Sequence, residues 1–223
     1  MKKFFSTLIV LAVITTAAVA ETKMLSVNFA VPVDTINTKH EITYMGSETL
    51  KQQYTGIGFG VSGVNMFSNI VGLYTDVELG FFQSYKLSYA GMEGTAKRKE
   101  VLGDDGKQFS MNFLIGPAFK IFENDKIFLS AAPAGHWYMN YESIGNNATS
   151  GGFLGLGANA TFAFFFNDVV GISAGLDFAF DFLGYGDYRK EEESYSISGV
   201  SVTESYKNTH FNFTPKFGVS FKF

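Results

Sequence analysis

The chain has 223 residues and a formal net charge of −4, with 25 phenylalanines, 11 tyrosines, 24 glycines, 4 prolines and no cysteine. Without cysteine the protein has neither disulfide bonds nor thiolate chemistry, and its acidic balance gives no sign of nucleic-acid binding. Many aromatic residues and few prolines are typical of β-structure, and the length allows one domain.

The first twenty residues are expected to be a cleaved signal peptide. Lys2 and Lys3 precede an apolar run over residues 4–14, and the small residues Ala18 and Ala20 end the segment. This order is typical of an export signal, and the run is shorter than the ~20 residues of a membrane-spanning helix. We therefore expect residues 1–20 to be removed and residues 21–223 to form the mature domain.

Residues 209–223 alternate between two kinds of side chain. In a β-strand, successive side chains point to opposite faces. The even positions are polar or small, and they would form one face of the strand. The other face would be apolar: Phe211, Phe213, Pro215, Phe217, Val219, Phe221 and Phe223.

The same alternation, bounded by turn residues, predicts eight strands. They cover approximately residues 24–34, 53–64, 70–85, 107–122, 126–141, 152–166, 169–183 and 209–223. Their connections alternate strictly between long and short. The long connections are residues 34–52, 86–106, 142–151 and 184–208, and the short ones are 65–69, 123–125 and 167–168.

The last strand resembles the C-terminal strand of bacterial outer-membrane β-barrels, which their assembly machinery recognises. The residues that carry this likeness are Phe217, Val219, Phe221 and the terminal Phe223. The whole mature chain is similar to the small barrels of the OmpA/OmpX or OmpW type. The resemblance implies an all-β fold, an eight-stranded antiparallel up-and-down transmembrane β-barrel with short periplasmic turns and four long extracellular loops. It also implies a place in the outer membrane of a Gram-negative-type bacterium.

A soluble barrel of the lipocalin type, also of about eight strands, is the alternative fold. Such a barrel has an apolar interior, whereas here the second face of each strand is rich in glycine, serine, asparagine and charge. We therefore expect the phenylalanine-rich faces to meet lipid. Tyrosines near the long connections, among them Tyr54, Tyr85 and Tyr188, are expected to form an aromatic girdle at the membrane surface.

Seven charged or titratable residues are predicted to face the lumen as a polar network: Asp76, Glu78, Lys120, His136, Asp177, Asp181 and Lys216. Lys216, Glu78 and Asp177 lie at similar distances from the short turns. Because unpaired buried charge costs several kcal/mol, we expect these groups to pair and to fill the lumen. A narrow path for cations is the alternative.

No residue pattern predicts catalysis, a cofactor or a metal site. The first functional hypothesis is a non-enzymatic surface protein whose loops serve adhesion, envelope integrity or host contact. The second is transport of small solutes, as in an OmpW-like barrel. The third is a lipid A-modifying enzyme that uses His136 or His210 beside a serine or carboxylate. Residues 194–206 have β character and are expected to extend the last two strands, where an edge could bind partners by strand addition.

The expected partners follow from the resemblance to outer-membrane barrels. They are outer-membrane lipid, the β-barrel assembly machinery, periplasmic chaperones and an extracellular ligand of the loops. No nucleic acid is expected, and we expect a monomer.

Overall fold

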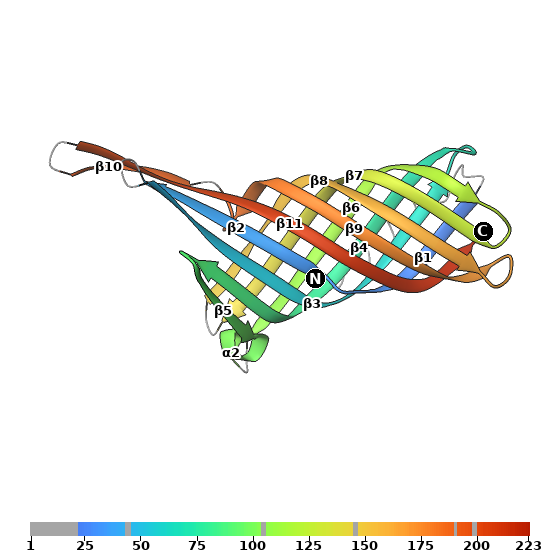
Figure 1. The fold of residues 1–223 in the computed structure, drawn as a ribbon, viewed down its shortest axis with the longest axis horizontal. Coiled ribbons are helices and arrows are strands. Elements are labelled where there is room, and N and C mark those ends of the chain that lie inside the picture. The colour runs from blue at the N-terminus through green and yellow to red at the C-terminus, as the bar shows by residue number, and fades with distance from the viewer. Residues whose placement is uncertain (1–21, 43–45, 104–105, 145–146, 190, 198–199) are drawn as a thin grey trace.

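A computed structural model describes residues 22–42, 46–103, 106–144, 147–189, 191–197 and 200–223 of the chain. The expected signal peptide, residues 1–20, lies outside these residues. Nearly all described residues lie in long tilted strands (Figure 1). In chain order the elements are β1 (Thr22–Ala30), β2 (Val33–Ile42), β3 (Gly46–Met66), β4 (Val71–Tyr89), β5 (Met92–Lys97), α2 (Arg98–Leu102), β6 (Lys107–Glu123), β7 (Ile127–Ile144), β8 (Asn147–Phe165), β9 (Val170–Gly186), β10 (Glu191–Ile197) and β11 (Val200–Lys222).

Backbone ladders join the strands into a continuous ring. β1 and β2 form one strand with an interruption at residues 31–32, where Pro32 has no N–H to donate, and both lie between β3 and β11. From β3 to β11 the wall strands follow in chain order, each antiparallel to the next. β11 then pairs with β1, from Met24↔Lys222 to Ala30↔Lys216. The predicted eight-stranded up-and-down barrel is therefore confirmed.

The three predicted short turns are confirmed, and asparagine side chains shape two of them. In the turn after β6, Oδ1 of Asn124 accepts hydrogen bonds from the backbone N–H groups of Lys126 (2.9 Å) and Ile127 (2.7 Å). Asn167 does the same for Val169 and Val170 before β9. An asparagine that bonds to the backbone two residues on is a standard way to reverse a chain tightly.

Most residues of the four predicted long connections are in strands. The expectation that residues 194–206 extend the last two strands is confirmed for the described residues, where β10 pairs with the start of β11. The strand extensions in the other three connections are not predicted by the sequence. β2 and β3 stay paired up to Ile42↔Gly46, and β7 and β8 up to Ile144↔Asn147. β10 pairs with the start of β11, and β5 with the end of β4. The main wall strands are 17–23 residues long, whereas a membrane crossing needs about 9–11. Beyond the membrane both faces of a strand meet water, so the apolar alternation stops while the ladder continues.

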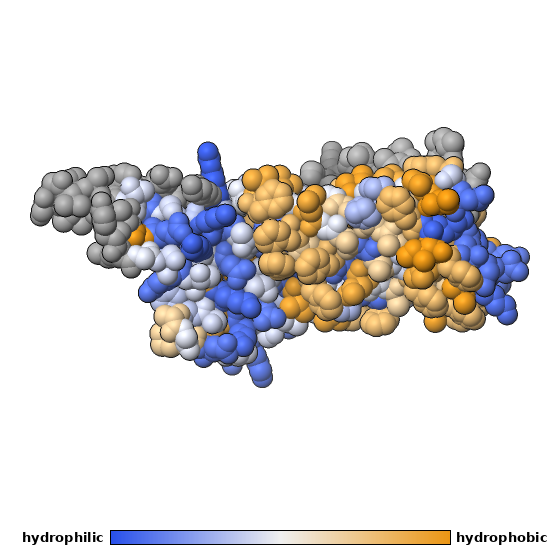
Figure 2. All heavy atoms as spheres, turned by 45° about the horizontal axis from the view of Figure 1, so that its top comes forward, coloured by the Kyte–Doolittle hydropathy of each residue, from blue (hydrophilic) through white to orange (hydrophobic). Residues whose placement is uncertain are grey.

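Apolar side chains cover the outside of the barrel, as predicted. Leu176 and Phe178 on β9 are exposed, while Asp177 between them is buried. Figure 2 shows an apolar band on the visible face of the barrel, with hydrophilic residues at both ends. A band of this kind is stable in lipid and would be a very large exposed patch in water. Within the part of the chain that the structure describes, no helix has the length and apolar character to cross a membrane.

The lumen is filled by side chains in three layers. At the short-turn end lies an apolar cluster: Met24, Val64, Met66, Tyr74, Leu114, Ala118, Phe128, Ala132, Ala134, Ala163 and Phe165. At the long-hairpin end lies a second cluster, which we call the upper aromatic cluster: Ile36, Tyr54, Phe82, Tyr85, Tyr138 and Phe153, with Val101 and Tyr188 packed against it. Polar and charged residues lie between the two.

The upper aromatic cluster corrects part of the predicted aromatic girdle, because three of its tyrosines lie in or against the lumen. Tyr54 and Tyr85 are buried in the lumen, and Tyr188 is partly buried against the same cluster. β4 carries one extra residue opposite the Thr55/Gly56 step of β3, and such a bulge exchanges the two faces of the strand. Tyr85 therefore points inward although its odd number predicts an outward side chain.

Candidate functional site in the barrel lumen

Lys216 lies among three carboxylates in the lumen. Its Nζ atom is 2.6 Å from Oδ2 of Asp76 and 3.3 Å from Oε2 of Glu78, and it forms a further ion pair with Asp177. The hydroxyl group of Tyr74 donates a hydrogen bond to Asp177. All of these side chains are buried. One ammonium group therefore holds together three carboxylates that would otherwise repel each other.

The register of three strands explains how Lys216 reaches its partners. Asp76 and Glu78 lie on β4, Asp177 on β9 and Lys216 on β11. Lys216 is directly opposite Gly175 of β9, so no side chain fills that neighbouring position. A small cavity beside Lys216 has room for about one water molecule.

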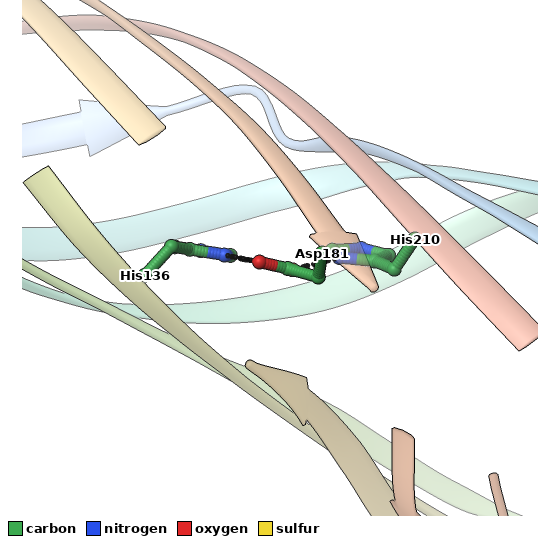
Figure 3. Close-up of side chains that lie close together, drawn as sticks. All are labelled: His136, Asp181 and His210. Atoms are coloured by element: carbon green, nitrogen blue, oxygen red, sulfur yellow. Dashed lines mark hydrogen bonds and ion pairs between the residues drawn. The ribbon is translucent and has the colours of Figure 1, made fainter. Parts of the chain in front are cut away.

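A second group of residues crosses the lumen as a chain of hydrogen bonds (Figure 3). Asp181 lies between two histidines: its Oδ2 atom is 2.8 Å from Nδ1 of His136 and 2.7 Å from Nδ1 of His210. The other ring nitrogen of His210, Nε2, is 2.9 Å from Oδ1 of Asp34. Asn212 also donates a hydrogen bond to Asp34. The side chains of His136, Asp181, His210 and Asp34 are fully buried.

The strand register places His136, Asp181 and His210 in one row around the barrel, which we call the histidine row. His136 on β7 is opposite Gly155 on β8, Gly155 is opposite Asp181 on β9, and Asp181 is opposite His210 on β11. A Cβ atom at Gly155 would lie 2.4 Å from Oδ1 of Asp181 and 2.2 Å from the backbone oxygen of Phe180. The glycine therefore leaves the gap through which Asp181 reaches His136 across an intervening strand.

The partners of the two histidines define where their protons lie. A carboxylate can only accept hydrogen bonds, so each ring nitrogen that faces one carries a proton. His210 faces Asp181 and Asp34, and His136 faces Asp181 and the side-chain oxygen of Asn112, 3.3 Å from its Nε2 atom. All four ring nitrogens are therefore engaged by oxygen atoms of Asp181, Asp34 and Asn112.

Asn112 joins the two groups into one network. Its amide nitrogen faces Oε1 of Glu78 at 3.4 Å, while its oxygen accepts from His136. The network therefore extends from the ammonium of Lys216 to the carboxylate of Asp34. The ring of Tyr138 stacks on that of His210, with centroids 4.0 Å apart, and separates the network from the long-hairpin end.

The structure brings together six of the seven predicted lumen residues. These six are Asp76, Glu78, His136, Asp177, Asp181 and Lys216. Lys120 lies apart from them, which corrects the prediction. It forms an ion pair of 2.6 Å with Glu123, and Glu123 also binds Lys222 at 2.7 Å. Lys120 is too close to the short turn after β6, and its flexible stem takes the ammonium to the rim.

The seven predicted lumen residues leave out several members of the network, among them Asp34, Tyr74, Asn112, Asn159, His210 and Asn212. Asn159 donates a hydrogen bond of 2.6 Å to Asp177. The pattern places Asp34 where the first predicted strand meets the long connection, and Asn112 and Asn159 carry no charge that would single them out. The alternation along each strand could have identified these residues, because their side chains point to the same inward face as the other lumen-facing positions.

The predicted assembly residues lie on the outer face of β11 near the short-turn end. Phe217, Val219 and Phe223 are exposed, and Phe221 is half-buried. The backbone of Phe223 exchanges two hydrogen bonds with that of Lys23, of 2.9 and 3.3 Å. The last residue of the chain therefore completes the ladder that closes the barrel.

Ion pairs also link the strand extensions at the long-hairpin end. Nζ of Lys86 on β4 is 2.8 Å from the Glu93 carboxylate on β5. The hydrogen bond from Lys86 lowers the pKa of Glu93 below its usual value. Both side chains are largely exposed, so water and salt screen this pair.

The fold, the apolar exterior and the charged, filled lumen together define a bacterial outer-membrane β-barrel. No protein-family model matches the sequence, and no curated protein matches it.

Solved structures of similar architecture include the attachment invasion locus protein Ail of Yersinia pestis, with 14% identity and a TM-score of 0.44 over 92% of this chain and 100% of Ail. The outer-membrane protein OprG of Pseudomonas aeruginosa has 11% identity and a TM-score of 0.49 over 93% of this chain and 98% of OprG. The outer-membrane protease OmpT of Escherichia coli has 6% identity and a TM-score of 0.48 over 93% of this chain and 100% of OmpT. Because these likenesses are distant and include a protease, they do not assign an activity.

Proposed function

We propose that the protein is a non-enzymatic surface protein of the outer membrane, and that it acts through the strand extensions at its extracellular end. The observation that carries this proposal is the contrast between the two parts of the barrel. The lumen is packed with side chains, whereas the strands of the long-hairpin end continue well beyond the apolar band (Figures 1 and 2).

The filled lumen argues against transport as the main function. The upper aromatic cluster, the charged network and the lower apolar cluster follow one another along the barrel axis, and each consists of buried side chains. A solute would have to displace paired charges and packed rings. A stabilising core of this kind suits a barrel that serves as a rigid support.

The hairpin of β10 and β11 is the strongest candidate for contact with a partner. Figure 1 shows it projecting beyond the rest of the barrel. Among the residues that the structure describes, β10 pairs with β11 alone, so its other edge is open. An open edge strand can bind an extended peptide by strand addition.

The surroundings of the two lumen histidines argue against a lipid-modifying enzyme. Their side chains are fully buried, and their four ring nitrogens face carboxylates or an asparagine oxygen. In the described part of the chain no serine is bonded to either ring. A lipid substrate would have no route to these groups from the membrane.

The test compares bacteria that display the full chain with bacteria that display a variant in which a Gly-Asn turn replaces residues 191–203. Heat-modifiable migration first checks that both barrels fold. We expect the full chain to increase attachment to cultured host cells or immobilised extracellular-matrix proteins, and the shortened chain to lose that increase. Equal attachment by both strains, or no increase over cells without the protein, would overturn the proposal.

A further inference from the structure

We propose that His136, His210 and Asp181 form a binding site for a divalent transition-metal ion of the zinc type. One ligand atom from each of the three residues lies within 4.8 Å of the other two. The Nδ1 atoms of both rings point at the same carboxylate oxygen, at 2.8 and 2.7 Å. Two imidazole nitrogens and one carboxylate are a donor set that zinc accepts, with a fourth position left for water.

The size of the site suits such an ion. With metal–ligand bonds of ~2.1 Å, the ligand atoms of a tetrahedral zinc ion lie roughly 3.4 Å apart. The present nitrogen–oxygen distances would each have to increase by roughly 0.6 Å to reach that spacing. Histidine side chains can move this far by small rotations, while the strands stay in place.

The groups behind the histidines provide a second, independent reason. A histidine that binds a metal usually donates its other N–H group to a carboxylate or carbonyl oxygen, which fixes the orientation of the ring. Nε2 of His210 faces Oδ1 of Asp34 at 2.9 Å, and Nε2 of His136 faces Oδ1 of Asn112 at 3.3 Å. Both rings therefore already have the supporting partners of metal ligands.

A metal ion would bind through the unprotonated Nδ1 atoms of both rings, so any proton on those atoms would leave to solvent as the ion binds.

The acidic group around Lys216 does not offer the same opportunity. Asp76, Glu78 and Asp177 also place carboxylate oxygens within 4.8 Å of one another. There the ammonium of Lys216 already occupies the centre of the group. The chain supplies its own cation at that position, and the histidine row is the site that can exchange with an external one.

The chain offers a clean way to test this site, because it contains three histidines. The third is His40, which lies near the extracellular end, stacks on Tyr206 and faces Glu204. An untagged H40Q variant would keep only the two lumen histidines. This H40Q chain, refolded in detergent with Zn²⁺ and then desalted, should retain about one zinc per chain and unfold at a higher temperature than the same protein refolded with Mg²⁺.

Further substitutions in the H40Q background assign the ligands. H136Q and H210Q should each reduce retained zinc at least tenfold, and D34N should weaken zinc binding about 10- to 100-fold through the orientation of His210. Heat-modifiable migration checks the fold of each variant. If H40Q retains no zinc, or if H136Q and H210Q retain as much as H40Q, the proposal is wrong.

A spectroscopic measurement decides the matter even where the lumen variants do not fold. Cu²⁺ bound to the H40Q chain should show two imidazole nitrogens by pulsed electron paramagnetic resonance, and only His136 and His210 can supply them. A copper signal with one imidazole or none would contradict the site.

Discussion

Lys216 is the residue on which the charge balance of the lumen depends most. Its ammonium group contacts Asp76, Glu78 and Asp177, and all four side chains are buried. Removing one partner of a buried ion pair typically costs 3–5 kcal/mol, because the remaining charge stays buried without compensation. Here three carboxylates would remain.

We predict that Lys216→Met lowers the free energy of unfolding by about 3–5 kcal/mol at neutral pH. The loss should be smaller in acid, because the crowded carboxylates become neutral there and cease to repel each other. Urea unfolding in lipid vesicles at two pH values measures both quantities.

Two further variants check the origin of that effect. Asp177→Asn in the Lys216→Met background should recover part of the stability, since it removes one of the repelling charges. Lys120→Met is the matched control, because Lys120 pairs with Glu123 near the rim and should cost much less. An equal loss at both pH values would show that the Lys216 effect is not electrostatic.

Gly155 tests the packing of the histidine row. We predict that Gly155→Ala destabilises the barrel by about 1–3 kcal/mol, because the new Cβ atom would overlap the backbone of Phe180 and the carboxylate of Asp181. Gly135→Ala on β7 is the control, since the nearest atom to its Cβ position is 3.8 Å away. Equal stability of the two variants in urea unfolding would contradict the tight packing of this row.

The lumen also shows what can be inferred from sequence at the scale of single residues. Parity along each strand predicted correctly that Asp76, Asp177 and Lys216 face inward. Counting residues from the short turns also placed Lys216, Glu78 and Asp177 at one depth, and the structure pairs Lys216 with both acids. Parity did not predict the row of His136, Asp181 and His210, because contacts across the lumen depend on the stagger of strands far apart in the chain and on side-chain length. Lys120 is an example. Its position in the alternation correctly predicts an inward side chain, but it lies so close to the short turn that its ammonium group pairs with Glu123 at the rim of the barrel.

At the scale of elements, the apolar alternation predicted the membrane part of each strand but not the extensions, of which only the one over residues 194–206 was expected, from its β character. β3 and β11 continue far past the residues whose alternation is apolar. Outside the membrane no face is buried in lipid, so polar residues occupy both faces and the period-2 signal disappears. The pairing of these segments is set by the neighbouring strand, which a local pattern does not contain.

The two faces of β9 give a direct test of which side meets lipid. Phe178 is 48% exposed on the outer face of the barrel, so Phe178→Arg would place a charge in hydrocarbon. We predict a loss of about 2–4 kcal/mol on unfolding from lipid vesicles. Thr49→Arg, at an exposed position on the extension of β3, is the control and should have little effect. Equal effects of the two substitutions would contradict the membrane placement of β9.

The end of β11 tests the assembly signal. Phe223 is 70% exposed, so its ring adds little to the packing of the folded barrel. We predict that Phe223→Ala lowers the amount of barrel in the outer membrane and increases periplasmic degradation, because the terminal strand would lose part of the pattern by which it resembles an assembly signal. Phe166→Ala is the matched control, since Phe166 is also exposed at the short-turn end and lies outside that strand. Comparable yields of the two variants on membrane fractionation would rule the signal out.

At the scale of the whole molecule, the lumen is packed with side chains and the strand extensions project beyond the apolar band. Apolar layers at both ends of the lumen enclose the charged network, which links side chains of β4, β7, β9 and β11. The order of the strands, the closure of the barrel and the side of each strand that meets lipid were predictable, because they follow from the alternation of side chains and the positions of the turns. The layered filling was not, because it depends on how rings from distant strands pack together.

Planar-bilayer recording with purified, refolded protein tests most directly whether the barrel wall encloses a packed lumen. We predict no discrete steady conductance steps in the intact chain. Stable, reproducible openings that persist across the voltage range would contradict the packed lumen and favour a pore.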